Sequence, residues 1–110
     1  MTPSLRTLSF DSATGVLRVD AREIRLTETE RKLVALLMLR VNQPLTHQEI
    51  RTGVWGAGWT GGDEALRVAI NRLRKKIEVN QRRPEVLTSV RGIGYRLVGA
   101  RSEEHTSELQ

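Results

Sequence analysis

Hydrophobic and polar residues alternate over the first expected elements of the chain. Two stretches rich in turn-forming residues, 11–15 and 20–21, interrupt the alternation, and such residues favour tight connections. Alternation puts one set of side chains on each face of a strand. The pattern therefore predicts an antiparallel meander of short strands. The expected strands are Leu5–Phe10, Val16–Val19 and Arg22–Leu26.

A helical period then replaces the alternation. Threonine is followed three residues later by glutamate twice, at 27–30 and at 46–49. This spacing is the capping box, in which the hydroxyl and the carboxylate each accept a backbone N–H that is free at the helix start. We therefore expect a first helix from about Glu28 to Val41, ended by Pro44, and a shorter second helix that ends at Trp55. One face of the first helix is apolar, with Leu33, Leu36, Leu37 and Val41.

The third helical segment has two unlike faces. It follows a glycine-rich loop at residues 56–62 and extends from about Asp63, a residue type that caps helices well, to about Val79. Its apolar stripe consists of Leu66, Ile70, Leu73 and Ile77. At about 100° per residue, the opposite face carries Glu64, Val68, Asn71, Arg72 and Lys75, flanked by Arg67 and Arg74. We expect the stripe to lie in the core and the mostly basic face to lie in solvent.

Two strand-like segments, Val86–Val90 and Tyr95–Val98, come last in the pattern. The sequence Arg-Gly-Ile-Gly at 91–94 separates them and predicts a β-hairpin with Arg91 at its tip. A tip beside glycine presents a guanidinium with little bulk around it, as entry into the minor groove of DNA requires. The two glycines do not predict a phosphate-binding loop, because a strand follows them rather than a helix.

The positive charge of the chain is concentrated in one segment. The net charge is +5. Residues 1–66 are neutral, whereas residues 67–96 carry nine Lys or Arg against two Glu. Such a one-sided positive field is expected of a protein that binds a polyanion, because each phosphate that is neutralised releases counterions. Anionic lipid is the weaker alternative.

Composition limits the other classes of function. The chain of 110 residues allows one domain, and without cysteine it has neither disulfides nor thiolate sites. Its two histidines have no close partner for a metal, and Thr88 and Ser89 have no histidine nearby that could activate them. We expect neither a cofactor nor an enzyme. The longest apolar run, residues 33–39, is too short to span a membrane, so we expect a soluble, cytoplasmic protein.

The final segment, residues 101–110, differs from the rest of the chain. It reads RSEEHTSELQ, without apolar periodicity, and resembles the translation of a common sequencing adapter. We therefore expect a single domain at residues 1–100 and a non-native tail at residues 101–110.

The basic helix alone does not establish a function. Arginine can pair with guanine and asparagine with adenine in the major groove, which makes Arg72 and Asn71 candidate base readers. A solvated helix face is the simpler interpretation of an isolated basic helix. Two features favour DNA: Arg91 at the hairpin tip, and the order helix, short helix, helix, hairpin, which is the winged-helix plan. A winged helix that contacts RNA or protein is the remaining alternative.

The same residues carry a resemblance to a known family. Four motifs, at 26–30, 54–56, 70–77 and 89–97, resemble the OmpR/PhoB-type DNA-binding (effector) domain of bacterial response regulators. The resemblance implies an α+β fold, a winged helix-turn-helix with a four-stranded N-terminal antiparallel sheet, a three-helix core and a C-terminal hairpin wing. It also implies sequence-specific binding to tandem direct repeats in double-stranded DNA and transcription regulation. RNA polymerase would contact the loop at 56–62. The chain would be either the output domain of a two-component regulator, with a receiver domain docked on the meander, or a stand-alone factor.

The resemblance also assigns roles to individual residues. Val68, Arg72 and Arg74 match positions of the recognition helix that face DNA, and Arg91 matches the wing arginine of the minor groove. Trp55, Ser89 and Tyr95 match positions that touch or steady the sugar-phosphate backbone, although packing alone would also explain Trp55 and Tyr95. The full expected DNA-binding set is His47, Trp55, Arg67, Val68, Asn71, Arg72, Arg74, Lys75, Ser89, Arg91 and Tyr95.

Several positions depart from the family pattern. His47 and Glu64 stand where members often have arginine, and Arg67 replaces a frequent aspartate. Glu64 would repel phosphate unless it pairs with Arg67, so no target sequence can be transferred from a relative. We expect Arg67, Arg74, Lys75, Lys76 and Arg96 to bind phosphates, and Val68, Asn71, Arg72 and Arg91 to select the sequence. For Trp59, anchoring of the loop is favoured over contact with a partner.

Overall fold

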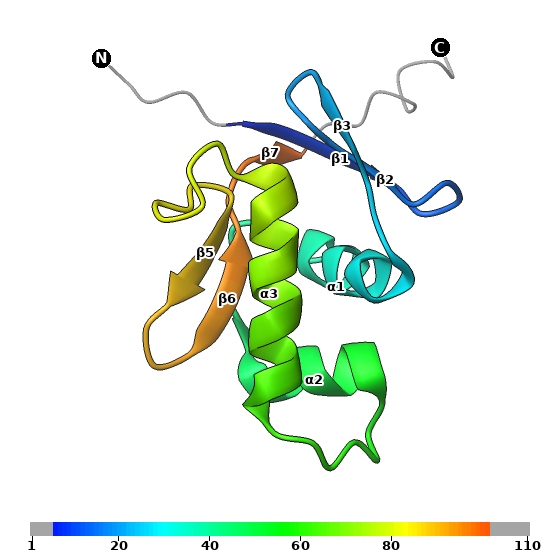
Figure 1. Ribbon diagram of the computed structural model, residues 1–110, viewed down its shortest axis with the longest axis vertical. Helices are drawn as coiled ribbons and strands as arrows, with labels where there is room; N and C mark the ends of the chain where they lie inside the picture. The colour runs from blue at the N-terminus through cyan, green and yellow to red at the C-terminus, as the bar shows by residue number, and fades with distance from the viewer. Residues whose placement is uncertain (1–5, 102–110) are drawn as a thin grey trace.

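The computed structural model describes residues 6–101 and contains two sheets and three helices (Figure 1). Leu5, which the first expected strand included, and residues 102–110 of the expected tail lie outside the described residues. The elements in chain order are β1 (Thr7–Asp11), β2 (Val16–Val19), β3 (Arg22–Arg25), α1 (Glu28–Met38), β4 (Leu45–Thr46), α2 (His47–Trp55), α3 (Asp63–Ile77), β5 (Leu87–Val90), β6 (Gly94–Leu97) and β7 (Ala100–Arg101). The expected α+β class is confirmed.

The N-terminal sheet has the strand order β3-β2-β1-β7. The predicted meander is confirmed, since β1 pairs antiparallel with β2 and β2 pairs antiparallel with β3. The fourth strand comes from the other end of the chain and runs parallel to β1. It includes Arg101, one residue beyond the expected domain end, whose Nη1 donates to the Met38 carbonyl at 3.1 Å.

Both predicted capping boxes are present. Glu30 N donates to Thr27 Oγ1 at 3.3 Å, and Thr27 N donates to the Glu30 carboxylate at 2.9 Å. The same reciprocal pair joins Thr46 and Glu49 at the start of α2. The predicted end of the first helix at Val41 is wrong, because α1 ends at Met38. Its last turn tightens through i to i−3 bonds, and Asn42 then takes a left-handed φ of 70°.

The predicted start of α3 near Asp63 is confirmed, but the predicted capping residue and the predicted end are wrong. Asp63 is the first helical residue, while the N-cap is Gly62, without a side-chain hydrogen bond. The Asp63 carboxylate instead accepts from Arg51 of α2. The helix ends at Ile77 rather than Val79, because Glu78 is extended and its carboxylate turns back toward the following loop. There it accepts the backbone N–H groups of Glu85, Val86 and Leu87.

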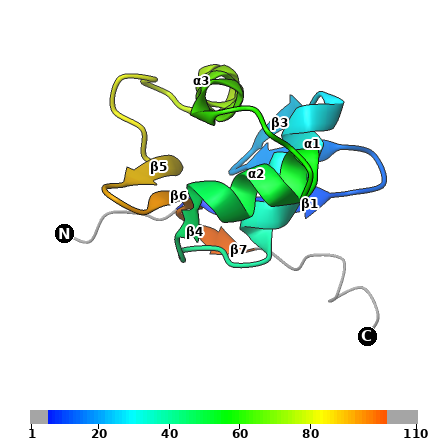
Figure 2. The ribbon, with the colours of Figure 1, turned by 90° about the horizontal axis from the view of Figure 1, so that it is seen from below.

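The predicted apolar stripe of α3 lies in the core. Leu66, Ile70, Leu73 and Ile77 are each at most 1% exposed. They belong to one buried cluster with apolar side chains of α1, α2 and both sheets. The second sheet has the order β4-β6-β5. Helix α3 lies between α1 and the β5–β6 hairpin, and its other side is uncovered (Figure 1, Figure 2).

Candidate nucleic-acid interface

The uncovered side of α3 carries the residues predicted to contact DNA. Glu64, Arg67, Val68, Asn71, Arg72 and Lys75 are all exposed; we call this set the α3 surface. No hydrogen bond or ion pair with another residue of the described chain engages the side chains of Arg67, Asn71, Arg72 or Lys75. Their polar groups can therefore bind a partner without breaking an internal contact. Glu64 forms no ion pair with Arg67 within the described range.

Local structure explains why Arg91 lies at the hairpin tip. Strand β5 ends at Val90 and β6 begins at Gly94, so the turn consists of residues 91–93. This is one residue shorter than expected, because Gly94 pairs with Val90. Gly92 has a φ of 77°, which favours glycine, and Ile93 N donates to the Val90 carbonyl at 2.9 Å. The Arg91 side chain is exposed.

Four predicted site residues form one cluster between α3, the hairpin and the start of α2. Arg74 Nε donates to the Leu87 carbonyl and Arg74 Nη2 to Ser89 Oγ, both at 3.0 Å. The guanidinium carbon lies 5.7 Å from the centre of the Tyr95 ring. That ring in turn lies 5.5 Å from the His47 ring. The structure thus brings together Arg74, Ser89, Tyr95 and His47, which come from three separate segments of the chain. The guanidinium of Arg74 is engaged in contacts within the protein.

Lys76 and Arg96, which were expected to bind phosphates, also have internal partners. Lys76 Nζ lies 2.6 Å from the buried Glu30 carboxylate and donates to the Arg25 carbonyl at 3.1 Å. Burial alone would raise the pKa of Glu30, but hydrogen bonds from Lys76 and Thr27 outweigh it and lower the pKa below its ordinary value of 4.5. Arg96 Nε donates to Thr88 Oγ1 at 3.3 Å. The ammonium of Lys76 thus has internal partners, and its contact with phosphate stays a prediction.

Trp55 lies apart from the cluster and holds the glycine-rich loop. Its ring packs partly against the core and stacks on Trp59, with centres 5.4 Å apart and planes at 24°. A Cβ atom on Gly61 would lie 2.2 Å from the Trp59 ring, so the loop backbone passes close to that ring. Trp59 keeps 39% exposure. The geometry agrees with the loop anchor that the sequence favoured.

Sequence reasoning missed the residues that hold α3 in place. The Glu78 carboxylate, which accepts backbone N–H groups of residues 85–87, fixes the segment after the helix. Arg22 Nη2 donates to the Ile77 carbonyl at 2.6 Å. Arg51 ties the first turn of α3 to α2. Each contact joins residues without a recognisable spacing, so no pattern in the sequence marks these residues.

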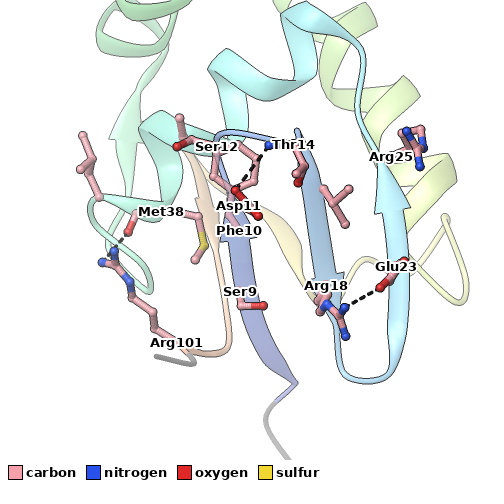
Figure 3. Close-up of a pocket in the computed structure, with 13 residues that line it drawn as sticks. Ser9, Phe10, Asp11, Ser12, Thr14, Arg18, Glu23, Arg25, Met38 and Arg101 are labelled. Atoms are coloured by element: carbon pink, nitrogen blue, oxygen red, sulfur yellow. Dashed lines mark hydrogen bonds and ion pairs between the residues drawn. The ribbon is translucent and has the colours of Figure 1, made fainter. Parts of the chain in front are cut away.

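A pocket lies away from the α3 surface, between the N-terminal sheet and α1 (Figure 3). Its volume is about 1020 Å³, and its lining includes Phe10, Met38 and the ion pair of Arg18 with Glu23 at 2.5 Å. Across residues 6–101, no three His, Cys, Asp or Glu side chains come together as metal ligands would.

Comparisons with known proteins agree with this geometry. A family model described as "Transcriptional regulatory protein, C terminal" matches residues 21–97. The sensory transduction protein RegX3 of Mycobacterium tuberculosis is 38% identical over 90 residues, which are 82% of this chain and 40% of RegX3. This chain therefore spans less than half the length of that relative.

Solved structures with a similar fold include two complexes with DNA elements. The RstA DNA-binding domain of Klebsiella pneumoniae with the RstA box has a TM-score of 0.73 at 25% identity, over 88% of this chain and 96% of that one. The AdeR DNA-binding domain with an intercistronic region has a TM-score of 0.68 at 25% identity, over 84% and 94%. No helix in the described part of this chain has the length and apolarity to cross a membrane.

Proposed function

This chain belongs to the OmpR/PhoB-type family of DNA-binding domains that regulate transcription, and we propose that it reads duplex DNA with α3 in the major groove and Arg91 in the minor groove. The observation that carries the proposal is that two neighbouring elements each present exposed cationic side chains without an internal partner in the described chain. The α3 surface and the Arg91 turn belong to neighbouring elements, and α1, α2 and the N-terminal sheet cover neither (Figure 1, Figure 2).

The α3 surface supplies groups suited to reading bases. Arg72 matches guanine O6 and N7, Asn71 matches adenine N6 and N7, and Val68, which is 39% exposed, suits a thymine methyl group. Arg91 lies in the exposed three-residue turn of the hairpin and would enter the minor groove, where A·T-rich sequence strengthens the negative potential. We assign sequence selection to these four residues.

A second group of residues supplies contacts to the sugar-phosphate backbone. Arg67 and Lys75 border the base-reading residues on α3, and both have free cationic groups within the described chain. Ser89, Tyr95, His47 and Trp55 lie at the hairpin and at α2, where a backbone strand would pass. Such contacts fix register and affinity but carry no sequence information.

Three further partners follow from the family and belong to the same proposal. Tandem direct repeats would place two copies head to tail on DNA. The loop at 56–62, which Trp59 folds back on Trp55, would contact RNA polymerase. The surface around the large pocket of the N-terminal sheet would receive a receiver domain. Loop substitutions that abolish activation but leave DNA affinity intact would support the polymerase contact.

Selection from a randomised pool of DNA duplexes tests the function. We expect the bound fraction to converge on one motif, with two copies in the same orientation. A scrambled version of that duplex and an RNA hairpin of equal length are the controls. Recovery without a motif, or tighter binding to the RNA, would contradict sequence-specific reading of duplex DNA.

A further inference from the structure

Arg74 is the one arginine of α3 whose guanidinium is held on the hairpin. It makes two hydrogen bonds to β5, with the Leu87 carbonyl and with Ser89 Oγ. It also lies 5.7 Å from the ring of Tyr95 on β6. Arg67 and Arg72 have no comparable contact in the described part of the chain. Arg74 therefore differs from Arg67 and Arg72, whose guanidinium groups are free to bind a phosphate.

Two directed bonds from one planar group constrain geometry more than a single ion pair does. A guanidinium donates in a rigid fork, so both bonds form only when α3 and β5 have one separation and one angle. Tyr95 on its face fixes the orientation of the plane, and the His47 ring supports Tyr95 from α2. Arg74 thus joins α3, both strands of the hairpin and the start of α2.

The core holds the base of the hairpin, where Leu87 and Leu97 are fully buried, but the turn at residues 91–93 is exposed. Strand β6 pairs with only the two residues of β4 on its other side, and a two-stranded ribbon is marginally stable by itself. Arg91 lies beyond the last strand pair, where any change in hairpin angle displaces it most. A hairpin whose angle varied in the free protein would have to be fixed on binding, at a cost in affinity.

We propose that Arg74 is a positioning residue, which sets the angle of the hairpin so that α3 and Arg91 enter their two grooves together. The inference rests on the proposed function, because it concerns how the same interface is assembled. It differs from the role that the family resemblance implied for Arg74, in which the residue contacts DNA directly. The two roles predict different behaviour when Arg74 and Arg91 are changed together.

A double-mutant cycle separates the roles. Arg74→Lys keeps the positive charge but cannot form the fork, and Arg91→Ala removes the tip. Affinities of the whole chain, the two single variants and the double variant are measured on the selected duplex. Arg91→Ala lowers affinity by some factor in the unchanged chain. We expect that factor to be at least about three times smaller in the Arg74→Lys background, since the effects of residues in one network of contacts are not additive. The salt slope of Arg74→Lys should be unchanged, because its charge remains.

Lys75→Ala combined with Arg91→Ala is the matched control. Lys75 is exposed on the same helix without a contact to the described hairpin, so its effect should add to that of Arg91→Ala. Thermal unfolding of every variant confirms that binding is compared between folded proteins. Should Arg74→Lys fail to fold, Ser89→Ala removes one arm of the fork at an exposed position and should also weaken the Arg91→Ala effect.

The outcomes are distinct. Additive effects of Arg74→Lys and Arg91→Ala would overturn the positioning role and leave a direct contact with DNA as the role of Arg74. If Arg91→Ala had no effect on affinity in the unchanged chain, Arg91 would not contact DNA. That result would also overturn the positioning role, because Arg74 would have no contact to position. If the unchanged chain itself fails to bind any duplex, the proposed function fails first.

Discussion

At the scale of single residues, the basic side chains divide into two groups according to their surroundings. Arg72, Lys75 and Arg91 are exposed and have no internal partner in the described chain. Arg74 and Lys76 donate to groups of the protein itself. A phosphate or base that approaches the first group replaces water, whereas one that approaches the second must break internal hydrogen bonds. The first group should therefore account for most of the binding free energy.

Arg72→Ala tests base reading. Loss of a bidentate contact to guanine should cost about 1–3 kcal/mol on the preferred duplex and relax the choice of base at one position. Affinity would be measured on a set of duplexes that differ from the selected one by single base pairs. An equal loss on every duplex would show that Arg72 only neutralises charge.

Lys75→Ala tests the phosphate contacts. Loss of one phosphate contact should weaken binding to all duplexes similarly and reduce the slope of log affinity against log salt by about one. Lys32→Ala is the matched control, because Lys32 is exposed on α1 and outside the α3 surface. An unchanged slope for Lys75→Ala, or an equal change for Lys32→Ala, would rule out the assignment.

At the scale of elements, the hairpin depends on a close approach of β6 to β4. A Cβ atom on Gly94 would lie 1.9 Å from the Leu45 carbonyl oxygen. Backbone cannot yield as a flexible side chain can, so Gly94→Ala should lower the free energy of unfolding by about 1–3 kcal/mol or more. Urea unfolding measures this change.

Gly58→Ala is the control for that experiment, because nothing lies within 4 Å of a Cβ atom there. Its effect on the free energy of unfolding should be small, as expected for an open loop position. Equal effects of the two substitutions would mean that the strand β6 can move away from β4 without loss.

Elements governed by local signals were predictable from the sequence. Both capping boxes, the core stripe of α3 and the Arg91 turn depend on neighbours in the chain, and the structure has them. The capping residue and the C-terminal end of α3 were wrong because tertiary contacts decide them: the Asp63 carboxylate pairs with Arg51 instead of capping the helix, and Glu78 leaves the helix and accepts backbone N–H groups of the next segment. The same reason applies to the Arg74 cluster, whose members are distant in sequence.

At the scale of the whole molecule, separate regions are available to separate partners. The N-terminal sheet with its large pocket lies at one end, and the loop at 56–62 lies at the other (Figure 1). The α3 surface lies between them along the helix. A DNA duplex on α3 would therefore leave both ends accessible, as the proposed contacts with a receiver domain and RNA polymerase would require.

The pH dependence of stability is a property of the whole fold, because Glu30 joins α1 to α3 through Lys76. The lowered pKa of Glu30 means that the folded state holds its proton less tightly than the unfolded state. Stability from this group is therefore fully present above pH 4.5 and lost as the pH falls through the lowered pKa.

Glu30→Gln isolates this contribution. The substitution should lower the free energy of unfolding by about 1.5–3 kcal/mol at pH 7, the range for hydrogen bonds to charged groups. The difference from the unchanged chain should shrink as the pH falls below 4.5. Unfolding by urea at several pH values measures it, and a difference that is constant or grows on acidification would contradict the assignment.

The most direct test of duplex reading compares the affinities of the selected duplex and its scramble across a series of salt concentrations. We predict a steep slope for both, from the shared phosphate contacts, and a gap between them that persists at high salt, from base contacts on α3 and at Arg91. Parallel slopes with no gap at any salt concentration would contradict sequence-specific recognition and reduce the α3 surface to a general binder of polyanions.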